Sequence, residues 1–133
     1  MSAATILAGL RIAVIEDEFL VAMQLGQMLR DLGAEVVGPA SNVAAAEKLL
    51  TDSAIDGAVL DMRLGNETSA PLAEHLLKRG VPVILTTGYG EDSLPEGLTK
   101  MPRLSKPYTK SGFEDAARRH FIAKRGASSR TDG

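Results

Sequence analysis

The stretch RIAVIEDE, residues 11–18, joins a continuous apolar run to three consecutive carboxylates. Arg11 to Ile15 has the unbroken apolar pattern of a strand that is buried on both of its faces. The apolar positions that follow, from Val21 to Leu32, recur at helical spacing, and Gly33 marks the end of that helix. A buried strand followed directly by an amphipathic helix is the repeating unit of a parallel sheet.

The same alternation continues along the chain and extends the sheet. Only a weak helix is predicted between Glu91 and Leu98, because Pro95 and Gly97 interrupt it. Five strand-then-helix units predict an α/β fold, a doubly wound five-stranded parallel sheet with helices on both faces. The further strands are predicted at 34–37, 55–60, 81–85 and 103–105. Two further helices are predicted to begin at N-caps, one at 41–42 and one at 68–69. The last helix is predicted from about Ser111 to about Lys124.

Composition bounds the class of protein. The chain has 133 residues, with 15 Lys and Arg against 17 Asp and Glu, and the resulting net charge of −2 gives no broad attraction to nucleic acid. It has no cysteine, which excludes disulfides, thiolate catalysis and Cys-ligated metals. We expect one domain over residues 8–125, with flexible tails at 1–7 and 126–133. No apolar run is long enough to span a membrane and no secretion signal is evident, so we expect a cytoplasmic protein.

Polar residues follow the predicted strands at the points where chemistry is expected. Glu16 and Asp17 follow the first strand, Asp61 the third, Thr87 the fourth and Lys106 the fifth. In an open parallel sheet, ligands bind outside the carboxyl ends of the strands, so these side chains are expected to converge. Three carboxylates favour a Mg²⁺ ion, which prefers oxygen ligands, and a carboxylate can accept a phosphoryl group.

These motifs resemble the receiver domains of response regulators in two-component signalling, and the resemblance runs from about Leu10 to Lys124. It implies a flavodoxin-like sheet in the order 2-1-3-4-5 and a Mg²⁺ cofactor. The residue roles that it implies are a phosphoacceptor (Asp61), metal ligands (Glu16, Asp17, Asp61 and the backbone carbonyl of Arg63), a switch hydroxyl (Thr87), a phosphoryl-binding ammonium (Lys106) and a phosphoryl-binding N–H (Gly88).

The fourth strand narrows the resemblance further. VPVILTTGYG, residues 81–90, is similar to the alphaproteobacterial receivers whose fourth strand ends in Phe-Ala-Thr-Gly-Tyr, with Leu85 and Thr86 in place of Phe-Ala. Most receivers carry a Tyr or Phe three residues before the lysine; this chain departs from that pattern with Arg103 at the position of the usual aromatic switch. Arg63 and Tyr89 flank the implied phosphoryl site, and the resemblance implies that they tune its hydrolysis, with Tyr89 also a candidate for the missing ring.

The resemblance implies a response regulator that receives a phosphoryl group on Asp61 from a histidine kinase or a histidine phosphotransfer protein. The chain ends soon after the fifth unit, so we expect a stand-alone regulator, not an enzyme, that acts through an unknown downstream protein or as a phosphate sink. It is expected to bind neither nucleic acid nor membrane and to be a monomer or a weak homodimer. Two alternatives stay open, an unphosphorylated receiver-like adaptor and a small phosphatase. The phosphatase is less favoured because the chain has no Gly-rich phosphate loop after the first strand and has Arg63, not a second acid, two residues beyond Asp61.

Overall fold

A computed structural model describes residues 6–88, 96–98 and 100–122 of the chain. Its centre is a parallel sheet of five strands, and the order of those strands confirms the predicted order 2-1-3-4-5. Reading across the sheet, the strands are β2 (Glu35–Ala40), β1 (Arg11–Ile15), β3 (Gly57–Asp61), β6 (Val83–Thr87) and β7 (Arg103–Ser105).

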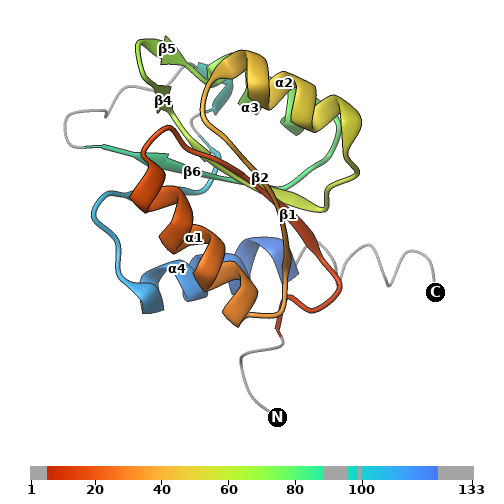
Figure 1. Cartoon of the computed structure of the whole chain (residues 1–133), viewed down its shortest axis with the longest axis vertical. Coiled ribbons are helices and arrows are strands. Elements are labelled where there is room, and N and C mark those ends of the chain that lie inside the picture. The colour runs from red at the N-terminus through yellow and green to blue at the C-terminus, as the bar shows by residue number, and fades with distance from the viewer. Residues whose placement is uncertain (1–5, 89–95, 99, 123–133) are drawn as a thin grey trace.

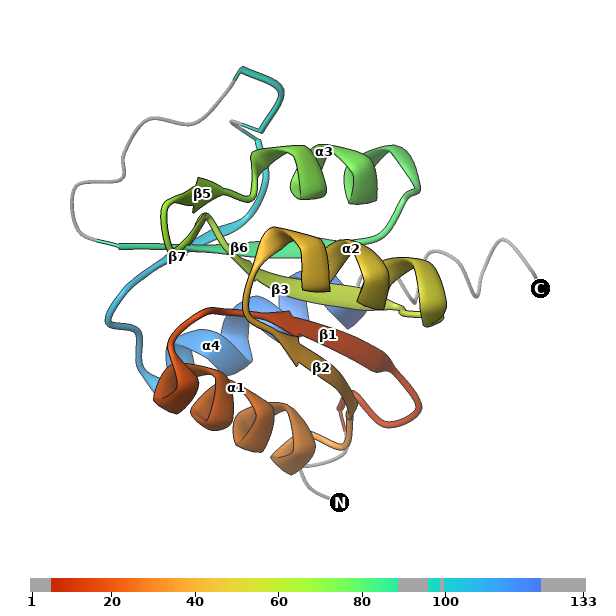
Figure 2. The ribbon, with the colours of Figure 1, turned by 45° about the horizontal axis from the view of Figure 1, so that its top comes forward.

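Helices cover both faces of this sheet, as Figures 1 and 2 show. On one face lie α1 (Phe19–Asp31) and α4 (Lys110–Ala117), and α4 continues into a π-helical segment, η3 (Arg118–Ile122). On the other face lie α2 (Val43–Asp52) and α3 (Ala70–Lys78), together with the short 3₁₀ helix η2 (Glu96–Leu98) that contacts α3. In the described residues, none of these helices combines the length and the apolar character that crossing a membrane requires.

Alternation along each strand divides the buried side chains between two cores. On β1, Ile12 and Val14 point to the core beneath α1 and α4, while Ala13 and Ile15 point to the core beneath α2 and α3. The predicted inner face of the last helix is confirmed, because Phe113, Ala117 and Phe121 are all buried in the first of these cores. Since both faces of the central strands are buried, they read as continuous apolar runs.

Several stretches differ from the sequence prediction. The second strand runs past the predicted end at 37 to Ala40, and the third begins at Gly57 instead of 55 and ends at Asp61. The fourth strand begins at Val83, not at Val81, because Pro82 has no N–H to donate to a ladder, and the β-branched Thr86 and Thr87 extend the strand instead. Between the third strand and α3, where no strand was predicted, the chain forms a small antiparallel hairpin, β4 (Arg63–Leu64) with β5 (Glu67–Thr68), whose turn places Gly65 at a φ of +63°.

The predicted N-terminal tail, residues 1–7, is wrong at Leu7. Leu7 is fully buried in the core beneath α1, and its N–H donates to the carbonyl of Leu32 at 2.8 Å. An apolar side chain next to the first strand is more stable in the core than in water, so the chain packs before β1 begins. Residues 1–5, most of the predicted weak helix at 91–98, and the predicted tail at 126–133 lie outside the described residues.

Candidate functional site

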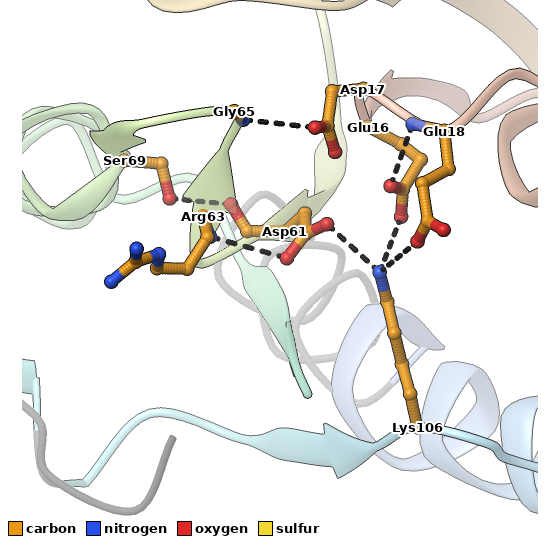
Figure 3. Close-up of polar contacts among 8 residues, drawn as sticks. All are labelled: Glu16, Asp17, Glu18, Asp61, Arg63, Gly65, Ser69 and Lys106. Carbon is orange, nitrogen blue, oxygen red and sulfur yellow. Dashed lines mark hydrogen bonds and ion pairs between the residues drawn. The ribbon is translucent and has the colours of Figure 1, made fainter. Parts of the chain in front are cut away.

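Asp61 is the last residue of β3 and lies at the carboxyl edge of the sheet, as the sequence predicted. Its side chain is buried, and Figure 3 shows its two oxygens facing different donors. Oδ1 accepts a hydrogen bond from the N–H of Arg63 at 3.2 Å, and Oδ2 accepts one from Lys106 Nζ at 2.8 Å. The hydroxyl of Ser69, at the N-cap of α3, donates to the carbonyl of Asp61 at 2.6 Å and anchors the end of the strand.

Lys106 follows β7 and brings its ammonium into a group of carboxylates. Besides Asp61, Nζ lies 3.0 Å from Glu16 Oε1 and 3.3 Å from Glu18 Oε1 (Figure 3). Burial opposes the charge of Lys106, but the attraction of the Asp61 and Glu16 carboxylates outweighs burial and raises the pKa of this ammonium above its usual range. Lys106 is therefore a fixed positive charge at the site.

Glu16 is the most deeply buried of the carboxylates. It is 1% exposed, and Oε2 accepts a hydrogen bond from the N–H of Glu18 at 3.1 Å. Burial raises the pKa of Glu16 to about 7, and the negative charge of Asp61 adds to the shift while Lys106 opposes it. A nearby cation would favour the ionised form of this side chain.

The structure brings together three of the acids, but not the predicted set. Oxygens of Glu16, Glu18 and Asp61 all lie within 4.8 Å of one another. Asp17, which was predicted as a metal ligand, turns toward the hairpin, where Oδ2 accepts a hydrogen bond from the N–H of Gly65 at 2.9 Å (Figure 3). Sequence reasoning did not assign Glu18 to the site, although it is the third acid of the run after β1.

The remaining predicted site residues are Thr87, Gly88, Arg63 and Tyr89. Thr87 ends β6 as a buried residue, and its carbonyl accepts from the N–H of Lys106 at 2.7 Å, but its hydroxyl makes no hydrogen bond to the three acids or to Lys106. Gly88 follows it directly. The guanidinium of Arg63 points away from Asp61 in Figure 3, and Tyr89 lies outside the described residues.

Arg103, at the position where most receivers carry an aromatic ring, lies in the edge strand β7. It is exposed and stands opposite Leu85 in the strand register, two residues before the pairing of Thr87 with Ser105. Because side chains two residues apart share a face, Arg103 and Thr87 face the same side of the sheet.

The donor set fits a hard divalent cation. All three acids offer oxygen, and Glu16 Oε1 is a buried atom that accepts no hydrogen bond from the described residues, although it lies within ion-pair distance of Lys106. When the three acids are ionised, a single ammonium leaves the group with an excess of negative charge. Mg²⁺ suits such oxygen ligands, so the cluster is consistent with a Mg²⁺ site.

Comparison with known proteins agrees with this arrangement. The family model of the response regulator receiver domain matches residues 12–117. The solution structure of SdrG from Sphingomonas melonis Fr1 is 39% identical, with a TM-score of 0.72, over 87% of this chain and 95% of that one.

Two curated relatives are longer than the chain. The transcriptional regulatory protein PdtaR of Mycobacterium tuberculosis is 30% identical over 103 residues, which are 74% of this chain and 50% of PdtaR. The phyllosphere-induced regulator PhyR of Methylorubrum extorquens is 39% identical over 83 residues, which are 60% of this chain and 31% of PhyR. The chain thus spans half or less of the length of these relatives.

Proposed function

The chain belongs to the response regulator receiver domain family, and from that premise we propose that Asp61 accepts a phosphoryl group from a phosphohistidine of a histidine kinase or a histidine phosphotransfer protein. Receiver domains are phosphoacceptor signalling domains rather than enzymes, so the small-phosphatase alternative is set aside. The observation that carries the proposal is the position of Asp61, a buried carboxylate at the end of the central strand with a lysine ammonium 2.8 Å from Oδ2.

The proposed reaction is a single displacement at phosphorus. An oxygen of the Asp61 carboxylate attacks the phosphorus, the bond from phosphorus to the histidine nitrogen breaks, and the nitrogen keeps the electron pair and is protonated as imidazole. The product is an acyl phosphate on Asp61. The hydrogen bond from the N–H of Arg63 to Oδ1 and the anchor of Ser69 on the carbonyl of Asp61 fix the orientation of the nucleophile.

Bound Mg²⁺ would supply positive charge at the oxygens of the transferring group. Glu16 and Asp61 would hold it, together with Asp17 and the backbone carbonyl of Arg63. Lys106 stays protonated and pairs with an oxygen of the phosphoryl group once Asp61 carries it. Thr87 and Gly88, at the adjoining strand end, supply the hydroxyl and N–H donors that respond to the new charge.

The signal to a downstream protein follows from the change of charge when Asp61 is phosphorylated. Asp61, Lys106 and Thr87 adjoin the surface formed by the carboxyl ends of β3, β6 and β7, so phosphorylation changes the surface that a downstream protein contacts. The same chemistry serves a phosphate sink, in which Asp61 drains phosphoryl groups from a shared donor. Arg63 and Tyr89, two residues after Asp61 and Thr87, tune the lifetime of the acyl phosphate, and an unchanged rate of phosphate release in Arg63→Ala and Tyr89→Ala would remove that role.

Intact-mass spectrometry tests the proposal. The protein is incubated with phosphoramidate and Mg²⁺, and we expect a gain of one phosphoryl group that EDTA prevents. Asp61→Asn should gain none, whereas Asp56→Asn should behave as the wild type, because Asp56 lies beyond the opposite end of β3 and accepts from the N–H of Arg11. A folded wild-type protein that gains no mass from phosphoramidate or from a phosphorylated histidine phosphotransfer protein would favour the unphosphorylated adaptor.

A further inference from the structure

Lys106 occupies the place in the site that a cation would be expected to occupy. Its ammonium contacts three carboxylates at once, at 2.8 Å from Asp61, 3.0 Å from Glu16 and 3.3 Å from Glu18. Two of these acids are buried, with side chains 6% and 0% exposed for Asp61 and Glu16, and the side chain of Glu18 is 62% exposed. The contacts therefore differ in kind, with two inside the site and one at its rim.

From these contacts we infer that Lys106 competes with the divalent cation for Glu16 and Asp61, and that Glu18 is the positioning residue that holds Lys106 aside when the cation is bound. The inference rests on the proposed cation site. Two positive charges within a few ångströms of each other repel, and both are attracted to the same buried oxygens. Entry of the cation therefore weakens the contacts of Lys106 with Glu16 and Asp61, and Glu18 is its remaining partner among these acids.

This arrangement gives Glu18 an effect on the cation that passes through Lys106. Without Glu18, Lys106 has only Glu16 and Asp61 as acid partners in the cluster, so it opposes the cation more strongly. A direct ligand would behave differently, because its loss would weaken the cation whether or not Lys106 is present. The two roles can be separated by combining the substitutions in one double-mutant cycle.

Calorimetric titration of the full chain with Mg²⁺ measures the cycle, and it requires no phosphorylation. Lys106→Met should bind Mg²⁺ about tenfold more tightly than the wild type, and Lys106→Arg, which keeps the charge, should stay near the wild-type value. Glu18→Gln should bind about threefold more weakly in the wild-type background. In the Lys106→Met background the same substitution should change the affinity by much less.

Controls address net charge and folding. Lys48→Met removes a lysine that pairs with Asp52 on the surface of α2, and it should leave the affinity for Mg²⁺ unchanged. Thermal unfolding by circular dichroism confirms that each variant is folded, and Lys106→Gln replaces Lys106→Met if the latter is not.

The outcomes separate this inference from the proposed function. Equal affinity of the wild type and Lys106→Met would overturn the competition. An equal loss on Glu18→Gln in both backgrounds would make Glu18 a direct ligand and overturn its positioning role. A wild type that binds no Mg²⁺ would overturn the inference together with the cation site, while phosphorylation of Asp61 is read separately by mass.

Discussion

The two ends of the sheet are built on opposite principles. At the amino end, β3 begins with Gly57, and a Cβ on this residue would lie 2.7 Å from Cε1 of Phe121 and 3.1 Å from Cδ1 of Ile12. At the carboxyl end, the same strand finishes in Asp61, which shares Lys106 with Glu16 and Glu18. The start of β3 is closely packed against apolar side chains, and its end gathers like charges around a single ammonium.

The difference assigns stability and function to different ends of the same strands. Apolar contact at the amino end stabilises the fold without a partner, whereas the acids at the carboxyl end repel one another until a cation binds. Substitutions that remove side-chain contact at the amino end should therefore lower stability. Substitutions that remove a polar group at the carboxyl end should raise it, as is common where function requires strained or uncompensated groups.

Phe121→Ala should have the largest effect. The ring is 2% exposed and packs against Gly57 and the core beneath α1, so its removal leaves a cavity next to the sheet. We expect a loss of about 3–5 kcal/mol in the free energy of unfolding, measured by urea denaturation. A loss below about 1 kcal/mol would show that the amino end is not the stabilising end.

Gly57→Ala should have the second largest effect, a loss of about 1–3 kcal/mol in the free energy of unfolding, because a methyl group cannot enter the space that the buried Phe121 ring occupies. Gly26→Ala is the matched control in α1. A Cβ there meets only Arg30, at 3.4 Å, so alanine should raise stability by about 0.5–1 kcal/mol through its better helix propensity. Equal effects of the two alanines would contradict the packing argument.

Glu16→Gln should change stability in a way that depends on pH. Because the pKa of Glu16 rises from 4.5 to about 7 on folding, the native state binds more protons than the unfolded chain between these values, and metal-free wild-type protein loses stability as pH rises through that window. Glutamine removes the loss, so Glu16→Gln should gain on the order of 2 kcal/mol over the wild type above pH 7, and the gain should shrink toward pH 4.5. A gain independent of pH in thermal melts with EDTA would contradict this account.

Thr86→Val should have the smallest effect, a gain of about 1 kcal/mol in the free energy of unfolding. Thr86 lies in β6 opposite Asp61, it is fully buried, and its hydroxyl finds no hydrogen-bond partner in the described part of the chain. Valine keeps a β-branched shape and removes the buried polar atom. A loss of stability in the urea midpoint of this variant would show that the hydroxyl is satisfied in solution.

Most of the fold could be predicted from short-range patterns. The strand at Arg11–Ile15 and the one at Arg103–Ser105 were predicted with their observed bounds. The errors lie where local rules compete, as at Pro82, which lies within an apolar run but cannot donate to the ladder. The β4–β5 hairpin was missed because strands of two residues carry no periodicity to detect.

The site could be predicted only to the level of the strand ends. The sequence placed Asp61 after the third strand and Lys106 after the fifth, at the same edge of the sheet, and the structure brings the two side chains to 2.8 Å. It could not show which of three consecutive acids would face inward, because the direction of each side chain depends on how the chain leaves β1. The turn that offers the N–H of Gly65 to Asp17 forms 48 residues further along the chain.

Identification of the residue that carries the phosphoryl group tests the central claim most directly. Phosphorylated protein is treated with borohydride, which reduces an acyl phosphate on aspartate to homoserine, and the modified residue is located by peptide sequencing in the mass spectrometer. We predict homoserine at position 61, where Asp61 lies within hydrogen-bond distance of Lys106. Reduction at Glu16, Asp17 or Glu18 instead, with residue 61 left as aspartate, would contradict the account.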